Sequence, residues 1–194
     1  RPDWGRGRID PFNPVKFRML QQPIDATIGN SDMVPVWGPA QRDGQAYHWD
    51  GLNSSLREVV LSSALGDGAT KQWVDRDMAH WDDADPKTRS SLRRIQDFMM
   101  KAPVPPYPFA IDKALAAQGA TVFAANCANC HGTGGARTGT IIPQTEVGTD
   151  PHRKDMWTTS AATAYNAFGA GRTWKFSNFR HTEGYVAMPH AGLW

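Results

Sequence analysis

Both cysteines of this 194-residue chain lie in one five-residue segment, and that segment constrains the fold more than any other feature. Cys127, Cys130 and His131 form the pattern C-x-x-C-H, which is typical of the covalent attachment site of a c-type haem. Each thiol can add to one haem vinyl group, and the adjacent imidazole then faces the iron as the proximal ligand. The sequence therefore predicts one covalent haem c, with the porphyrin forming part of the hydrophobic core.

Three other interpretations of this segment explain it less well. A redox-active dithiol of the thioredoxin kind uses C-x-x-C but requires neither the adjacent histidine nor the glycine that follows it. A structural zinc site needs four ligands, and the chain has no second cysteine pair to complete one. A chance match of two ordinary thiols leaves the correctly placed histidine unexplained.

The composition is that of a soluble globular protein, with 40% hydrophobic and 21% charged residues. A formal net charge of +2 at pH 7 gives no reason to expect nucleic acid or an acidic membrane as a partner. No apolar run approaches the ~20 residues that cross a bilayer, so no membrane span is predicted. Because haem c is attached outside the bacterial cytoplasm, we expect a periplasmic or secreted protein whose signal was removed before Arg1.

Hydrophobic spacing predicts a mainly α-helical chain. Residues 1–50 have no sustained pattern and many prolines and glycines, which predicts a long irregular wrapping segment with a short strand pair. Pro86 is expected to open a helix after an Asp85 cap. Helices are predicted at 53–66, 86–102, 112–126 and 158–168, with a further turn or two at 71–81. The post-motif stretch 132–155 and the tail from 174 onward are expected to be loops.

The helix before the cysteines resembles the opening of class I c-type cytochromes. Gly119 and Phe123 are four residues apart and share one helical face. In that family the glycine admits a crossing C-terminal helix, and the aromatic ring packs on the haem edge. A helix with one tolerated glycine is the alternative. The chain is thus expected to divide into a wrapping segment with two helices at 1–105 and a cytochrome c domain at 106–194, incomplete at its C-terminus.

The residue opposite His131 decides whether the iron transfers electrons or binds peroxide or O₂. In single-haem relatives a methionine, often followed by proline, supplies this ligand some tens of residues downstream, and Met188-Pro189 fits that pattern. His190 and His181 are further candidates, and a ligand outside this chain stays open. The ordinary alternatives are a methionine that fills the core and loop histidines that are solvated.

Five separated segments extend the resemblance beyond the motif. They are GRIDPFNP at 7–14, TIGNSDMVPVW at 27–37, HWDGLNSSLRE at 48–58, PPYPF at 105–109 and GYVAMPHAGLW at 184–194. Together they resemble the bacterial di-haem cytochrome c peroxidase superfamily, most closely its branch of rubber-cleaving di-haem oxygenases. The resemblance implies that the chain covers the inter-haem connection and the second haem domain.

The same resemblance implies a role for Trp49, which would lie between the two haems or border the first haem's pocket. Its π system could shorten an electron path between two porphyrins; a buried aromatic beside an Asp-Gly turn is the alternative. The chain departs from that family in having one C-x-x-C-H site instead of two, and in stopping at Leu193-Trp194. We therefore expect it to be a piece of a larger polypeptide, or one chain of a cleaved protein.

Three functions follow from the sequence. The first is electron transfer by one haem, to or from a redox partner protein or a second haem domain. The second is a di-haem peroxidase or oxygenase in which this haem supplies electrons to a catalytic haem outside the chain. The third is a non-haem binding module. No paired carboxylates or His–acid dyad stand out as peroxide-cleaving machinery, so no catalytic residue is assigned and enzyme activity stays undecided.

Overall fold

The computed structural model describes residues 12–27, 29, 31, 32, 34 and 36–192. The first part of the chain contains a π-helix, η1 (Val15–Met19), and a 3-10 turn, η2 (Pro39–Arg42). Three α-helices follow, namely α1 (Leu56–Gly66), α2 (Lys71–Met78) and α3 (Ser91–Lys101). The apolar pair Leu193-Trp194 and most of the GRIDPFNP segment lie outside the described residues.

The second part of the chain holds the C-x-x-C-H motif. Its helices are α4 (Lys113–Asn126), α5 (Ala128–His131), α6 (Gln144–Val147), α7 (His152–Asp155) and α8 (Thr159–Phe168). Two short strands, β1 (Ile141–Pro143) and β2 (Gly184–Val186), pair antiparallel with Ile142 opposite Tyr185. The prediction of a mainly α-helical chain is confirmed, and the wrapping part carries three α-helices where two were expected.

Side-chain caps determine where several helices begin. Each cap satisfies a backbone N–H that has no partner inside the first helical turn. Ser55 accepts from the amide of Glu58 at α1, and Thr70 accepts from that of Trp73 at α2. Asp112 caps α4 through the amides of Ala114 and Leu115, and Thr158 caps α8 through that of Ala161.

The prediction that Pro86 opens a helix is wrong. Residues 86–89 form a turn, and α3 begins at Ser91, with the Ser90 side chain accepting from the amide of Arg93. The Ser91 amide donates to the Asp77 carboxylate of α2 over 2.7 Å. The start of α3 is therefore fixed by a contact with another helix.

The strand pair expected within residues 1–50 is also misplaced. The described residues of that stretch hold no strand longer than a single bridge. The pair instead joins 141–143 to 184–186, two segments that were expected to be loops. Helices α6 and α7 likewise occupy the stretch after the motif that was expected to be irregular.

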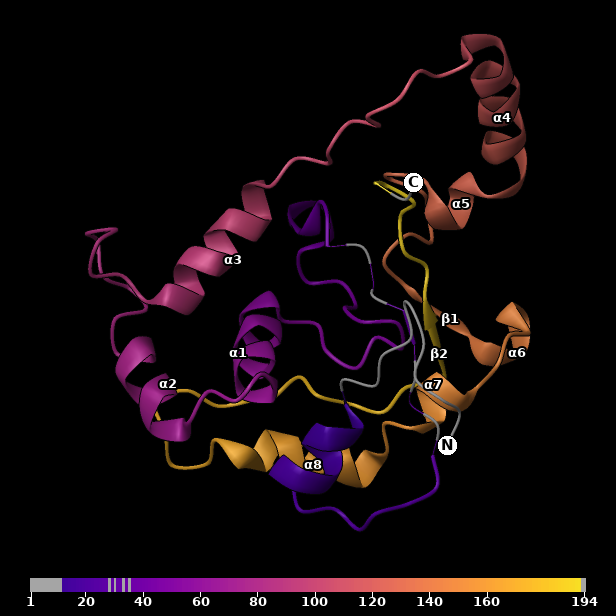
Figure 1. Ribbon diagram of the computed structural model, residues 1–194. Coiled ribbons are helices and arrows are strands. Elements are labelled where there is room, and N and C mark those ends of the chain that lie inside the picture. The colour runs from indigo at the N-terminus through magenta and orange to yellow at the C-terminus, as the bar shows by residue number, and fades with distance from the viewer. Residues whose placement is uncertain (1–11, 28, 30, 33, 35, 193–194) are drawn as a thin grey trace.

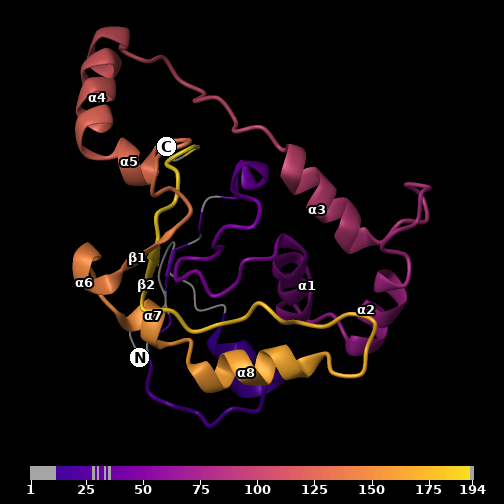
Figure 2. The same ribbon diagram turned by 180° about the vertical axis from the view of Figure 1, so that it is seen from behind.

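A buried aromatic cluster forms the main hydrophobic core. It gathers side chains of α1, α2, α8, the stretch after α7 and the segment 174–179. Trp157, Tyr165 and Trp174 are nearly inaccessible to solvent, and the ring centroids of Tyr165 and Phe179 are 4.1 Å apart. Figures 1 and 2 show α1, α2 and α8 on the same side of the molecule, away from α4 and α5.

The buried carboxylate of Glu58 on α1 fastens the C-terminal tail to this core. It accepts the backbone amides of Ser177 over 2.9 Å and Asn178 over 3.1 Å. The Asn53 side chain donates to the same carboxylate over 2.9 Å. These bonds hold the tail alongside α1, from where it continues to β2 and to the C-x-x-C-H motif.

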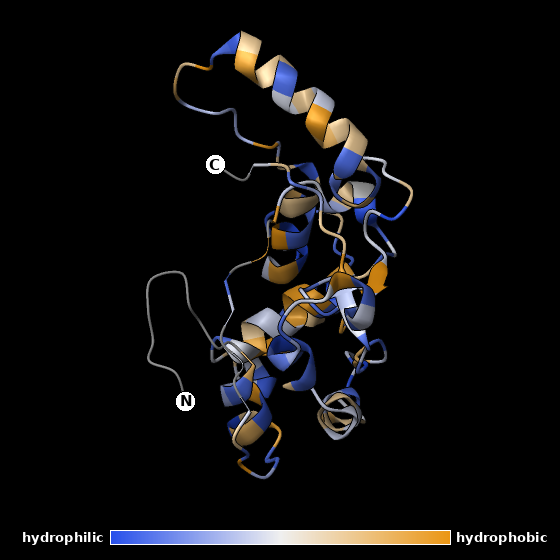
Figure 3. Ribbon diagram, turned by 90° about the vertical axis from the view of Figure 1, so that its right-hand side faces the viewer, coloured by the Kyte–Doolittle hydropathy of each residue, from blue (hydrophilic) through white to orange (hydrophobic). Residues whose placement is uncertain are grey.

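Helix α4 is attached to the body in a different way. Residues 102–112 have no regular structure, and they carry the chain outward from α3 to α4, as Figure 1 shows. No residue of α4 is buried, and Figure 3 shows apolar and polar turns alternating along it at one end of the molecule. A Cβ at Gly119 would meet nothing within 4 Å, so no described segment crosses that face. None of the described helices is both long and apolar enough to cross a membrane.

Candidate haem-binding site

The C-x-x-C-H motif folds as one helical turn at the end of α4. The carbonyl of Cys127 accepts the amides of Cys130 over 3.1 Å and His131 over 2.8 Å. This turn places Cys127 at the N-cap of the short helix α5, and Cys130 and His131 within that helix. Both cysteines are free thiols and are half-buried, so a ligand can reach them.

The loop after the motif folds back onto α5. The Thr138 hydroxyl lies 3.1 Å from the carbonyl oxygen of Cys130 and 2.7 Å from that of Gly132. The position of Gly135 requires glycine, because a Cβ there would lie 2.6 Å from the Asn129 carbonyl oxygen. The loop therefore closes tightly behind the cysteines and fixes the turn that carries them.

The ring of His131 is oriented by the C-terminal tail. Its Nδ1 lies 2.7 Å from the carbonyl oxygen of Met188, so this nitrogen carries the proton and donates it. The His131 carbonyl in turn accepts the amide of His190 over 3.1 Å. Since Nδ1 is engaged in this way, Nε2 is the nitrogen left with a lone pair for a metal.

A cavity of about 850 Å³, here called the His131 cavity, opens beside the motif. Cys130 and His131 line it, together with the apolar side chains of Ile142, Val147 and Val186. Its volume lies within the ~300–1,000 Å³ typical of ligand and cofactor sites. A covalent haem requires two free thiols, an imidazole that can face the iron, and apolar surroundings. The residues of this site supply all three, so they fit that group.

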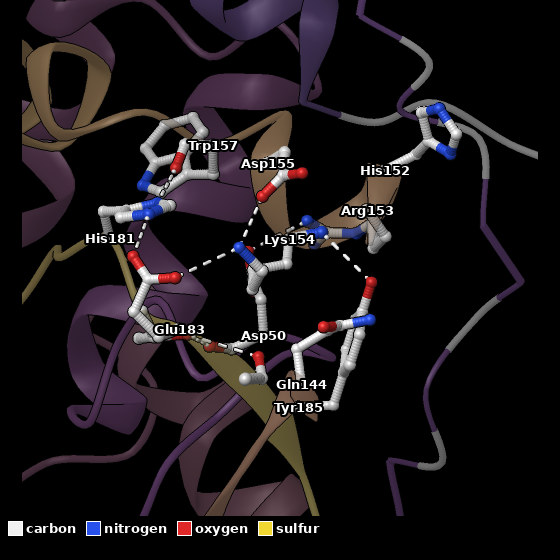
Figure 4. A network of polar contacts seen from close by, with 12 residues as sticks. Asp50, Gln144, His152, Arg153, Lys154, Asp155, Trp157, His181, Glu183 and Tyr185 are labelled. Carbon is white, nitrogen blue, oxygen red and sulfur yellow. Dashed lines mark hydrogen bonds and ion pairs between the residues drawn. The ribbon is translucent and has the colours of Figure 1, made fainter. Parts of the chain in front are cut away.

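Beside this cavity the chain builds a polar network, drawn in Figure 4. Arg153 of α7 donates to the Asp50 carboxylate over 3.0 Å, and both side chains are almost fully buried. Burial raises the pKa of Asp50, and the neighbouring Arg153 charge opposes that rise. The Tyr185 hydroxyl donates to the Asp150 carbonyl over 2.6 Å. Arg153 and Tyr185 both line the His131 cavity, so the network gives it a fixed wall.

A second, smaller cavity of about 310 Å³, here called the Arg42 cavity, lies next to the first. Arg42, Tyr47, His48 and Met188 are among the residues that line it. Four residues line both cavities, namely Ser31, Asp32, Trp49 and Arg153. Trp49 thus stands between the two spaces, and its indole Nε1 donates to the Asp32 carbonyl over 2.7 Å.

The three candidates for the sixth iron ligand lie in different surroundings. Met188 has a buried sulfur that accepts a hydrogen bond from Arg42 Nη1 over 3.3 Å, and it lines the Arg42 cavity. The His190 ring stacks on that of His131 with centroids 4.0 Å apart and 22° between the planes. Burial, and secondarily the His131 charge, lowers the pKa of His190.

His181 lies in the network of Figure 4, and both of its ring nitrogens are engaged. Nδ1 lies 2.6 Å from the Trp157 carbonyl oxygen, and Nε2 lies 3.0 Å from the Glu183 carboxylate. Of the three candidates, Met188 and His190 contact His131, Met188 through its backbone carbonyl and His190 through its ring.

Sequence reasoning gave no role to Arg42, Asp50 or Arg153. Asp50 stands in the HWDG segment, but its partner is 103 residues away, and Met188 is 146 residues from Arg42. Neither pairing leaves a local sequence signal. The described residues contain no group of three His, Cys, Asp or Glu side chains that could hold a metal ion by itself.

The family model described as cytochrome C oxidase, cbb3-type, subunit III matches residues 114–192. No curated protein and no solved structure matches the chain significantly. Residues 114–192, from α4 to the end of the described tail, are thus a cytochrome c domain, and a helical segment precedes it. The spacing of Cys127 and Cys130 within that domain is consistent with one covalent haem c.

Proposed function

We propose that this chain is an electron-transfer protein that carries one covalent haem c on Cys127 and Cys130, with His131 as the proximal iron ligand. When bound, the haem supplies the one-electron Fe(III)/Fe(II) couple. The contact between His131 Nδ1 and the Met188 carbonyl, 2.7 Å long, carries the proposal. It fixes the tautomer and orientation of the imidazole, as outer partners of metal-bound histidines do.

The other residues of the site form the walls around the proposed cofactor. Ile142, Val147 and Val186 give the His131 cavity an apolar wall against which a porphyrin ring would pack. Arg153 also lines this cavity, and its buried ion pair with Asp50 holds the side chain in place without adding net charge. The exposed surface of α4 leaves the motif accessible from outside, as exchange with a redox partner requires.

Each candidate for the sixth ligand within the chain would have to give up a contact that it makes in this structure. Met188 could reach the iron only if its sulfur left Arg42, and His190 only if its ring left that of His131. His181 would have to break two hydrogen bonds. We therefore propose that Met188 is the strongest candidate within the chain, and that a ligand from elsewhere competes with it.

The wider setting is also a proposal. The protein would be exported to the periplasm or secreted, and would work beside a redox partner or a second haem domain. One observation favours a second candidate function, part of a di-haem peroxidase or oxygenase whose catalytic haem lies outside this chain. Trp49 lines both cavities, which is the placement that an electron relay between two redox sites would need.

The test is a redox titration of protein produced in a bacterial periplasm with its haem-attachment machinery. We expect a reversible one-electron transition in the Soret and α bands, and no peroxide-dependent dye oxidation by this chain alone. Near-infrared magnetic circular dichroism then separates methionine–histidine from bis-histidine ligation. A two-electron thiol titration with no haem absorption would overturn the proposal, and rapid CO binding by the reduced protein would exclude a firmly six-coordinate iron.

A further inference from the structure

The Arg42 cavity combines apolar walls with three polar side chains that each have one buried atom without a hydrogen-bond partner. Its walls include Leu56 and Val59 of α1 and Met99 of α3. Arg42 Nε, the Tyr47 hydroxyl and His48 Nε2 are buried, and none has a hydrogen-bond partner among the described residues. Buried polar atoms in native proteins are almost always paired, so three around one cavity indicate a missing group.

Arg42 is the strongest of the three indications. Its side chain is 4% exposed, and its neighbours are the Met188 sulfur and the Tyr47 ring, whose centroid lies 5.5 Å from Cζ. Among the described residues, the ion pairs of the structure include none formed by Arg42, and burial lowers the pKa of its guanidinium. A buried guanidinium without a counter-ion is costly, and a bound anion removes that cost.

The chemistry of the unpaired atoms selects the kind of anion. Arg42 Nε and the Tyr47 hydroxyl are donors, and His48 Nε2 can donate in one tautomer. A carboxylate presents two oxygens with about four acceptor sites, which matches such a set and pairs well with a guanidinium. The apolar walls fit a hydrocarbon body attached to that carboxylate.

We propose that the Arg42 cavity binds a carboxylate carried on an apolar body, with Arg42 as its charge partner. Two sources have this chemistry. One is a propionate of the haem held at His131, because Met188 contacts both His131 and Arg42. The other is a separate apolar carboxylic acid. Only the propionate source rests on the proposed haem function. The haem content of each sample, measured as its pyridine haemochrome, shows whether a negative result reflects a missing haem or a haem-loaded protein whose Arg42 cavity binds no carboxylate.

The first arm of the test is equilibrium dialysis of the protein against labelled decanoate, with decanol as the uncharged probe. If a free acid is the ligand, decanoate binds at least tenfold more tightly than decanol. Arg42→Met should lose that difference, and Arg42→Lys should retain most of it. Arg76→Met is the matched control, because Arg76 is exposed on α2. Circular dichroism checks that each variant is folded.

The second arm is resonance Raman spectroscopy of the haem-loaded protein, where the propionate bending band reports hydrogen bonding to the propionates. If a propionate is the ligand, decanoate does not bind the loaded protein. The band then shifts in Arg42→Met but not in Arg76→Met or Arg42→Lys. The proposal is overturned if decanoate and decanol bind alike and the band is the same in wild type and Arg42→Met.

Discussion

The aromatic core and the C-x-x-C-H segment are built in opposite ways. In the core, Trp157, Tyr165 and Trp174 are almost completely removed from solvent and pack against the helices around them. In the motif segment, neither α4 nor α5 has a single buried residue. The first region is held by side-chain packing, and the second by hydrogen bonds at its ends.

The motif segment also leaves more apolar surface exposed than the core does. Thr138 and the carbonyl of Met188 fasten the motif at its C-terminal side, but α4 has apolar side chains, such as Leu115 and Val122, that are 65% and 61% exposed. A helix of 14 residues is marginal in water without tertiary packing. We infer that a haem supplies to the motif segment the buried apolar surface that aromatic side chains supply to the core.

Hydrogen exchange on a Cys127→Ala/Cys130→Ala variant tests this contrast most strongly. Without an attached haem, the amides of α4 should exchange on the order of 1,000-fold faster than those of α1 and α8, because they open without unfolding the core. Haem-loaded wild type is the control, in which α5 should gain protection. Equal protection of α4 and α8 in the variant would show that the motif segment is stable by itself.

Breaking the buried ion pair between Arg153 and Asp50 should have the next largest effect. Arg153→Met leaves Asp50 buried and unpaired, which should lower the free energy of unfolding by about 3–5 kcal/mol. Adding Asp50→Asn to the same chain should recover much of this loss, since no charge then remains. Urea denaturation of wild type and both variants measures these free energies of unfolding. If Arg153→Met alone were as stable as wild type, the ion pair would contribute little.

A smaller effect is expected from His48, which lies between the core and the cavities. Burial, together with the charge of Arg153, lowers its pKa to about 3. A histidine in the unfolded chain has a pKa of about 6.5. The contribution of neutral, buried His48 to the free energy of unfolding is therefore complete above that pH, and it is lost as the pH falls toward 3. Between these two pH values, the free energy of unfolding should fall by up to about 1.4 kcal/mol per pH unit because of this one group.

His48→Asn is the matched variant for this titration. His48 has a φ of 66°, a left-handed conformation that asparagine tolerates better than most residues. Unfolding free energies measured from pH 7 to pH 4 should fall less steeply for the variant than for wild type. Parallel curves would show that His48 titrates normally.

The smallest effect is expected at the surface of the motif segment. Arg137 and Glu146 form an ion pair whose side chains are 35% and 52% exposed. Exposed pairs contribute little, because solvent screens them. Glu146→Gln should therefore leave the melting temperature unchanged in calorimetry, and a clear decrease would mean that this pair, rather than a haem, holds the loop.

The sequence predicted the helices with local signals better than it predicted the features made by distant contacts. Helices α1, α4 and α8 were placed within three residues, because capping side chains and apolar spacing are local. The start of α3 was missed because it depends on Asp77 of another helix. The β1–β2 pair was missed because three-residue strands, joined across 40 residues, carry no alternation to detect.

The same distinction applies to the site. The motif identified Cys127, Cys130 and His131 because all its chemistry lies within five residues. The orienting carbonyl of Met188 was not predictable, since a backbone atom has no sequence signature and this one lies 57 residues from His131. Arg42 was missed for a similar reason, because its burial without a counter-ion exists only in the folded chain.

The most direct test of the account is the intact mass of the periplasmically matured protein under denaturing conditions. Wild type should carry the mass of one haem on a chain of 21.4 kDa, with a Soret band that survives denaturation. Cys127→Ala/Cys130→Ala should lose both, and His131→Ala should keep the mass but change the spectrum. A wild-type mass equal to the polypeptide alone, with both thiols free to react with an alkylating reagent, would contradict it.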